Sequence, residues 1–193
     1  TAYGQAGHGS FINNQNPVTT LTSAVAKLGS HEWPQTYTND VRELFTAIAD
    51  ALGRPLGDDY REFLVEIPSV ARMIAATLQN TANPTMLEAG YKANVIPKEA
   101  SAVIDGRFLP GHEDALNATI AQIVGPDIKI ETVTHDIALE VPFEGPLVEA
   151  MKASILKLDP EGIPVPYLMS GGTDNKALSE LGIVGYGFSP LRL

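Results

Sequence analysis

The sequence predicts an α+β fold, a ferredoxin-like split βαβ unit with a four-stranded antiparallel sheet and two helices on one face. Three observations indicate this fold. Apolar residues recur at helical spacing over 17–29 and over 112–124. Between these segments, residues 85–93 and 99–109 alternate in the manner of half-buried strands, and residues 127–134 alternate again after the second helix. This order of elements is that of the split βαβ motif.

The first strand and helix are predicted from small residues and helix-end signals. Residues 1–10, TAYGQAGHGS, contain three glycines and are interpreted as a strand that ends in a tight turn. Asn16 followed by Pro17 indicates a helix start, because proline is suited to the first helical position. Gly29 indicates the end of this helix.

A helical insertion of about residues 36–80 separates this helix from the second strand. Apolar spacing predicts three helical stretches within it, at 38–52, 58–66 and 69–79. Asn80 to Pro84 is interpreted as a turn cluster that ends the insertion.

The pattern changes once more beyond about residue 143. It predicts a helix, a strand, a helix and a strand, at 146–158, 165–169, 173–181 and 183–188. This order with short links favours part of an α/β sheet with parallel pairing. We therefore expect a first domain over 1–140, which carries the insertion, and a partial second domain over 141–193. Because the chain opens at Thr1 and stops at Leu193 inside such patterns, we expect both ends to be cuts in a longer protein.

The composition limits the classes of partner. The chain has 23 acidic and 13 basic side chains and a formal net charge of −10, which disfavours nucleic-acid and membrane partners. No apolar run approaches the roughly 20 residues that span a bilayer. Cysteine is absent, which excludes disulfides and thiolate zinc sites and fits a reducing compartment. We expect a cytoplasmic protein.

Three polar residues are candidates for contact with a substrate. His8 lies between glycines in GHGS, where an imidazole could polarise a carbonyl oxygen, although an ordinary polar residue in a turn has the same pattern. Arg107 could hold a carboxylate with two parallel bonds, or could pair with Asp105 on the solvent face of its strand. Asn94 could bind a ligand or cap its own turn.

The segment SGGTD at residues 170–174 is a fourth candidate. It follows a predicted strand and opens a predicted helix, so the amides of Gly171, Gly172 and Thr173 could form a cradle for an anion. Thr173 or Asp174 could equally serve as an ordinary helix cap.

The sequence contains no pattern typical of a metal site. No two of the four histidines, at positions 8, 31, 112 and 135, show His-x-x-x-His spacing, and no Glu-Glu pair occurs. No nucleophile elbow surrounds Ser10 or Ser170, which disfavours a serine hydrolase.

Three motifs together resemble the zinc-dependent aminoacylase and carboxypeptidase family, which includes acetylornithine deacetylase, succinyl-diaminopimelate desuccinylase and glutamate carboxypeptidase. They are GHGS, ANVIPKEASAVIDGRFLPG and SGGTDNKALSELGIVGYGF, at residues 7–10, 93–111 and 170–188. The segment from VPYLMSGGTD to GFSPLRL looks closest to an actinobacterial-type dipeptidase or aminoacylase branch. The resemblance implies a lid domain that mediates homodimerisation, joined to a catalytic domain with two zinc ions per active site.

The resemblance also implies roles for single residues. His8 matches a lid histidine that reaches the partner's active site and polarises the scissile carbonyl. Arg107 matches an arginine that holds the substrate carboxylate, and Asn94 matches the amide in the same grip. Gly171, Gly172 and Thr173 match a loop that lines the substrate pocket. Asn175 departs from the small residue usual at its position.

By the same resemblance, the metal ligands would lie before Thr1 and after Leu193. We therefore expect a severed part of a hydrolase that cleaves amides of N-acyl amino acids or peptides with a free carboxylate. This part would bind no stoichiometric zinc and would be inactive alone. The alternative is a self-standing dimerisation or ligand-sensing module on the same split βαβ sheet.

Overall fold

The computed structural model describes residues 1–190, which form two compact units. Unit 1 consists of residues 1–34 and 80–135. Unit 2 consists of residues 35–79 and the described residues from 136 onward. The insertion predicted from the sequence therefore falls in a different unit from the strands and helices on either side of it.

Unit 1 is built on a three-stranded antiparallel sheet. The strands are β1 (Ala2–Tyr3), β3 (Thr81–Ala89) and β5 (Glu99–Arg107), in the order β1-β5-β3. The two long strands match the predicted pair, but β3 begins inside the predicted turn cluster. Pro84 is tolerated there because β3 pairs only with β5 in the described chain, and a proline can turn its donor-less nitrogen away from the ladder of an edge strand. The register shifts between Pro84 and Met86.

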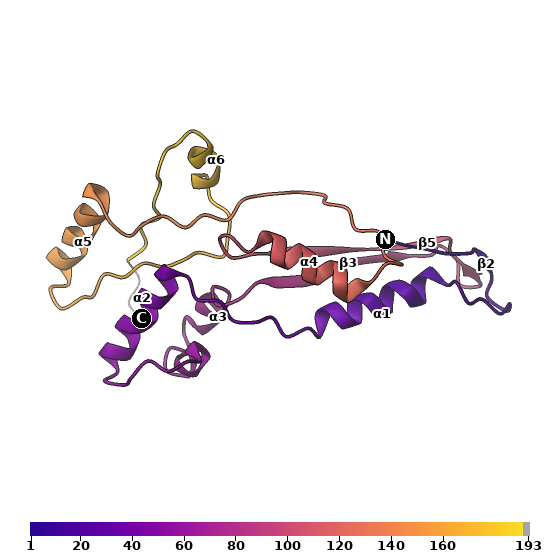
Figure 1. The fold of residues 1–193 in the computed structure, drawn as a ribbon, viewed down its shortest axis with the longest axis horizontal. Coiled ribbons are helices and arrows are strands. Elements are labelled where there is room, and N and C mark those ends of the chain that lie inside the picture. Colours follow the sequence, from indigo (N-terminus) through magenta and orange to yellow (C-terminus); the bar gives the residue numbers. More distant parts are fainter. Residues whose placement is uncertain (191–193) are drawn as a thin grey trace. The chain divides into compact units, whose positions relative to one another are not determined.

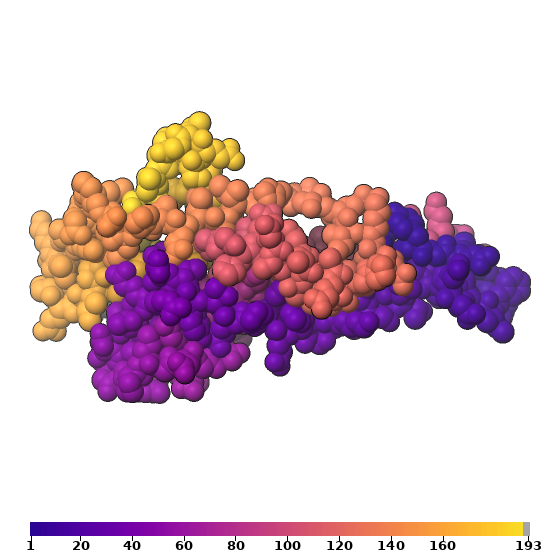
Figure 2. Space-filling view, viewed as in Figure 1, coloured from indigo at the N-terminus to yellow at the C-terminus, as the bar shows by residue number. Residues whose placement is uncertain are grey.

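Two further short strands, β2 (Gly7–His8) and β4 (Val95–Ile96), form a separate antiparallel pair. The segment with β4, which lies between the two strands predicted at 85–93 and 99–109, thus pairs with the glycine-rich N-terminal segment. In the space-filling view the indigo N-terminal residues form part of the surface at this end of unit 1 (Figure 2).

The predicted fourth strand over 127–134 does not form. Ile128 makes one isolated bridge with Ala2, and the backbones of Thr1 and Lys129 exchange hydrogen bonds of 2.8 and 2.9 Å. The bridge lies on the free side of β1, where a fourth strand would belong. Because β1 has only two residues, it offers too short a ladder for a regular strand to form against it.

Two helices cover one face of the sheet of unit 1. They are α1 (Pro17–Gly29) and α4 (Glu113–Val124), as the sequence predicts to within one residue, and Figure 1 shows them along the same side of β3 and β5. Asn16 caps α1, because its Oδ1 accepts the amide N–H of Val18 at 3.0 Å. The helices bury apolar residues against the sheet in two clusters, centred on Ala2, Leu21 and Ala100 and on Leu28, Ala82 and Leu116.

The insertion in unit 2 has its own apolar core. Its elements are α2 (Asn39–Ala51), the 3-10 helix η1 (Tyr60–Val65) and α3 (Ala71–Ala75), which is shorter than predicted. The buried residues of this core all come from positions 41–78, and its largest fully buried side chains are Phe45 and Phe63.

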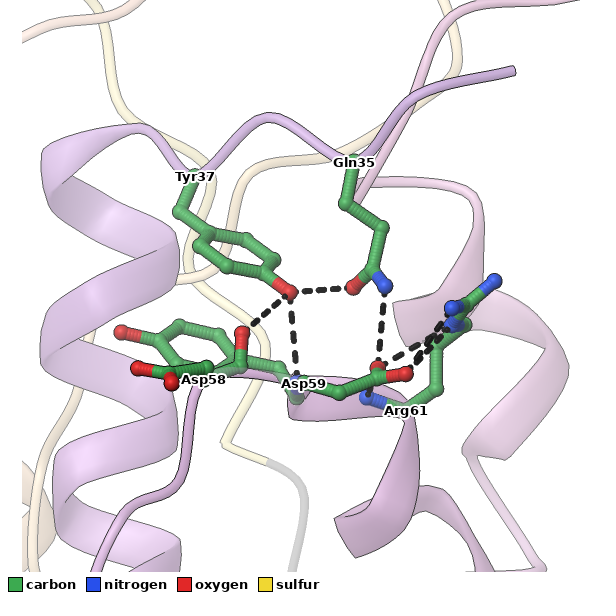
Figure 3. Close-up of polar contacts among 6 residues, drawn as sticks. Gln35, Tyr37, Asp58, Asp59 and Arg61 are labelled. Carbon is green, nitrogen blue, oxygen red and sulfur yellow. Dashed lines mark hydrogen bonds and ion pairs between the residues drawn. The ribbon is translucent and has the colours of Figure 1, made fainter.

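Hydrogen bonds close the base of the insertion. Gln35 forms a bridge with Gln79. Figure 3 shows Asp59 between Gln35, whose Nε2 donates to Oδ1 at 2.9 Å, and Arg61, whose Nη2 donates to Oδ2 at 2.8 Å. The bonds from Arg61 and then Gln35 hold the pKa of Asp59 below its usual range. The hydroxyl of Tyr37 bonds to Gln35 beside them. These contacts give the cluster a structural role.

The C-terminal part of unit 2 contains two helices, α5 (Pro146–Leu158) and α6 (Asn175–Glu180). Both were predicted, although α6 is shorter. The strands predicted at 165–169 and 183–188 are wrong, since neither segment is extended in a ladder. A buried strand needs a neighbour for its backbone groups, and none is paired with either segment in the described chain. Val165 and Leu168 pack instead against the core of the insertion.

This packing affects the expected domain organisation. The contacts join the insertion to the C-terminal segment in unit 2, and the two units divide between His135 and Asp136. The division of this chain into a lid domain over 1–140 and a partial catalytic-domain segment over 141–193 stays a prediction.

Candidate functional site

His8 and Asn94 lie beside each other where β2 pairs with β4. His8 is the second residue of β2, and Asn94 directly precedes β4. The Nε2 atom of His8 lies 3.2 Å from Nδ2 of Asn94, and the amide of Gly9 donates to the carbonyl oxygen of Asn94 at 2.8 Å. Both side chains are exposed. An imidazole and a carboxamide side by side can donate hydrogen bonds to a carbonyl oxygen or oxyanion that reaches them.

Arg107 lies at the opposite end of β5 from β4. Eight positions of extended chain separate it from Glu99, or about 26 Å at ~3.3 Å per residue. Unit 1 therefore does not bring Arg107 to Asn94, as a shared grip within one chain would require. Arg107 instead binds Asp105, with its Nε 2.6 Å from Oδ1 and Nη2 2.9 Å from Oδ2. A ligand carboxylate at Arg107 would have to compete with Asp105.

Gly171, Gly172 and Thr173 form an exposed loop in unit 2 before α6. Gly172 and Thr173 border an open depression of about 380 Å³ that Lys176 also lines. The ammonium group of Lys176 lies 2.7 Å from Oδ2 of Asp136. The same oxygen of Asp136 lies close to Gly172. The other charged lining residues, Asp174 and Glu180, are acidic. The charge of the depression therefore opposes an anion unless the anion replaces Asp136 at Lys176.

The described residues show no cluster suited to a metal ion. No three His, Asp or Glu side chains within 1–190 converge as metal ligands. His135 lies 2.7 Å from Glu113, and this pair has no third ligand. Within the same range, no helix has both the length and the apolar character that crossing a bilayer requires.

The structure adds two features that the sequence patterns missed. The sequence patterns raise Ser10 only as a possible nucleophile, yet its hydroxyl lies 2.8 Å from Nδ1 of His8. Its position two residues after His8 in GHGS is the signal that could have indicated this contact. Asp136 was missed as the partner of Lys176, because 40 positions separate them in the sequence.

The antiparallel sheet of unit 1, its two helices and the exposed His8–Asn94 pair all lie within a segment that matches a known family. Residues 1–130 match the family described as the peptidase dimerisation domain. The chain belongs to this family. This confirms the coarser part of the resemblance found in the sequence, whereas the dipeptidase or aminoacylase branch stays a prediction.

Two known proteins, both longer than this chain, are similar to it over most of its length. "Probable carboxypeptidase S-like 2" of Dictyostelium discoideum is 28% identical over 187 residues, which cover 88% of this chain and 34% of that protein. The crystal structure of an M20 family metallo-carboxypeptidase from Sulfolobus solfataricus matches 94% of this chain and 53% of that chain, with a TM-score of 0.59 and 21% identity. The chain thus spans about a third of the length of the first and about half of the second.

Proposed function

We propose that this chain is the dimerisation and substrate-gripping part of a zinc-dependent amidohydrolase. The substrate would be an N-acyl amino acid or a peptide with a free carboxylate. The observation that carries the proposal is the His8–Asn94 pair, which a peptidase dimerisation domain presents to solvent where the short strands β2 and β4 pair. The zinc ions would be held by other parts of the parent protein, and the protein would be cytoplasmic.

The residues of this chain would bind and orient the substrate. His8 would donate a hydrogen bond to the oxygen of the scissile carbonyl, with Asn94 beside it. Since unit 1 separates Arg107 from His8 along β5, the two would serve one substrate only if different copies of the chain supply them. This geometry supports a homodimer in which His8 reaches the partner's active site. Gly171, Gly172 and Thr173 would line the substrate pocket of the parent protein, as the family resemblance implies.

Zinc, when bound in the parent, would activate a water molecule and stabilise the oxyanion that forms on attack. The contribution of His8 would add to that stabilisation. Loss of one such donor typically lowers kcat by about 10²- to 10³-fold.

The experiment is an activity screen of the parent protein, loaded with zinc, against N-acyl amino acids and dipeptides. We expect hydrolysis, a fall in kcat for His8→Ala, and no comparable fall for His112→Ala, a control histidine at the start of α4. Equal activity of the two variants would contradict the role of His8. The chain by itself is expected to hydrolyse none of these substrates and to bind no stoichiometric zinc. A parent without hydrolytic activity that still dimerises would favour a dimerisation or ligand-sensing module.

A further inference from the structure

The two ring nitrogens of His8 have different partners. Nδ1 lies 2.8 Å from the hydroxyl of Ser10 and accepts the backbone N–H of Ser10 at 3.3 Å. Nε2 lies 3.2 Å from Nδ2 of Asn94. A neutral imidazole carries its proton on only one of these nitrogens, and the other is an acceptor. The partners therefore decide which nitrogen of His8 can donate to a substrate.

The backbone N–H of Ser10 is the partner whose role cannot change. It can only donate, and the surrounding backbone holds it in place, because Phe11 N–H donates to the carbonyl oxygen of His8 at 2.9 Å and Gly9 N–H donates to that of Asn94 at 2.8 Å. The hydroxyl of Ser10, in contrast, can rotate to donate or accept. The amide of Asn94 can exchange its oxygen and nitrogen by a half-turn about χ2.

We propose that Ser10 is a positioning residue that sets neutral His8 as the tautomer with its proton on Nε2. Both donors of Ser10, the backbone N–H and the hydroxyl, then point at the lone pair of Nδ1. Asn94 turns its Oδ1 toward Nε2 and accepts the proton until a ligand arrives. A carbonyl oxygen that takes the place of the amide then meets an N–H donor.

The opposite tautomer would have a different consequence. With the proton on Nδ1, the ring could donate to the hydroxyl of Ser10 and accept from Asn94. The backbone N–H of Ser10 would then face another N–H at 3.3 Å. Nε2 would present a lone pair, which repels a carbonyl oxygen, so the proposed donor function of His8 would be lost. Ser10 thus acts through His8 and does not itself touch the substrate.

The test is the NMR spectrum of the imidazole nitrogens in this chain, labelled with ¹⁵N, at a pH where histidines are neutral. The nitrogen shifts report directly which ring nitrogen carries the proton. Signals of His8 are assigned with His8→Ala, and His31, His112 and His135 serve as internal controls for folding. We expect the Nε2–H form to predominate at His8. A predominant Nδ1–H form in the unchanged chain would overturn the proposal.

Two variants of Ser10 separate positioning from a general structural effect. Ser10→Ala removes the hydroxyl but keeps the backbone N–H, so the ratio of Nε2–H to Nδ1–H is expected to fall by about 2- to 10-fold, as for the loss of one hydrogen bond. Ser10→Thr keeps both donors and is expected to preserve the ratio. An unchanged ratio in Ser10→Ala would contradict the role of the hydroxyl.

The role of this tautomer in substrate binding rests on the proposed function. The NMR measurement of the tautomer does not depend on that function. If His8 carries its proton on Nε2 and the parent protein is inactive, the positioning role of Ser10 is supported and the proposed hydrolase function is contradicted. If His8 carries its proton on Nδ1 and the parent protein depends on His8 for activity, the positioning role of Ser10 is contradicted and the proposed hydrolase function is supported.

Discussion

Gly4 faces the backbone of Gln15 so closely that a Cβ atom at position 4 would lie 2.0 Å from the carbonyl oxygen of Gln15. The same Cβ would lie 2.7 Å from Cδ of Pro17. The amide of Gln5 binds the carbonyl oxygen of Gln15 at 3.1 Å, so this contact joins the segment leading to β2 with the start of α1. The approach requires glycine for space alone, since Gly4 does not have a positive φ.

Gly4→Ala should therefore destabilise unit 1. We expect a loss of about 1–3 kcal/mol in the free energy of unfolding, because the atom that the Cβ meets is backbone and can move little. Gly7→Ala is the matched control, since nothing lies within 4 Å of a Cβ at that position. Urea unfolding followed by the fluorescence of Trp33, the one tryptophan of the chain, measures both. Equal midpoints would contradict the steric argument.

Phe45→Ala should destabilise unit 2. The ring of Phe45 is fully buried, and its centroid lies 5.0 Å from that of the Tyr60 ring and 6.4 Å from that of the Phe63 ring. Removal of this ring therefore leaves a cavity in the core of the insertion. The expected cost is about 3–5 kcal/mol. Val65→Ala, at a position that is 76% exposed, should change stability by less than about 0.5 kcal/mol. Urea unfolding followed by far-ultraviolet circular dichroism measures the difference, and similar losses in both variants would argue against a separate core in the insertion.

The stability of unit 2 should fall as the pH rises past the titration of Asp40. Burial, and then the nearby charges of Glu140 and Glu43, raise the pKa of Asp40 to about 6. The folded state therefore holds a proton that the unfolded state loses near pH 4, and this contribution disappears between about pH 4 and pH 6. Because Asp40 is only half-buried, we expect the loss to be about 1 kcal/mol.

Asp40→Asn tests this dependence. The variant should gain stability over the unchanged chain at neutral pH and lose that advantage at about pH 4, where Asp40 is protonated in the folded state. Asp50→Asn, an exposed position in the same helix, is the control. Parallel pH profiles for the unchanged chain and Asp40→Asn would exclude Asp40 as the source.

Charge on the edge strand should weaken the proposed homodimer. β3 pairs only with β5 in the described chain, and Met86 on it is 66% exposed. A lysine on an edge strand opposes pairing with another strand, so Met86→Lys should shift sedimentation toward the monomer. Val133→Lys, at an 83% exposed position outside the strands, should leave the dimer unchanged. A strictly monomeric chain at high concentration would contradict the dimer itself.

Competition between Asp105 and substrate predicts opposite effects for two variants of the parent protein. Arg107→Ala should raise KM about 10-fold or more, because it removes a bidentate carboxylate partner. Asp105→Asn should lower KM or leave it unchanged, since it weakens the intramolecular bond at Arg107. Steady-state kinetics on a substrate with a free carboxylate and on the corresponding amide test whether Arg107 recognises the carboxylate. If Arg107→Ala affects both substrates equally, Arg107 does not recognise the carboxylate.

Local sequence patterns were sufficient where neighbouring residues decide the structure. Asn16, Pro17 and Gly29 delimit α1 because capping and proline geometry act within one turn. The alternation over 99–107 indicates β5 because one face of that strand packs on helices. The motifs GHGS and VIDGRFLPG lie within the segment that matches the peptidase dimerisation domain, so they led to the correct family.

Patterns failed where a structure depends on a distant partner. Residues 127–134 alternate like a strand, but β1 is too short to pair with them. Residues 165–169 and 183–188 have the composition of buried strands and are paired with none in the described chain. Periodicity reports which face is apolar and does not report whether a neighbouring backbone is available.

The sequence by itself determined the helices of unit 1, its two long strands, the family and the identity of His8, Asn94 and Arg107 as candidates. Only the tertiary structure decided which candidates meet: His8 joins Asn94 across 86 positions, whereas Arg107 binds Asp105 two positions away. It also showed that Ser10 faces Nδ1 of His8. The physical reason is that strand register and turn geometry set side-chain neighbours, and both arise from hydrogen bonds between segments that lie far apart in the chain.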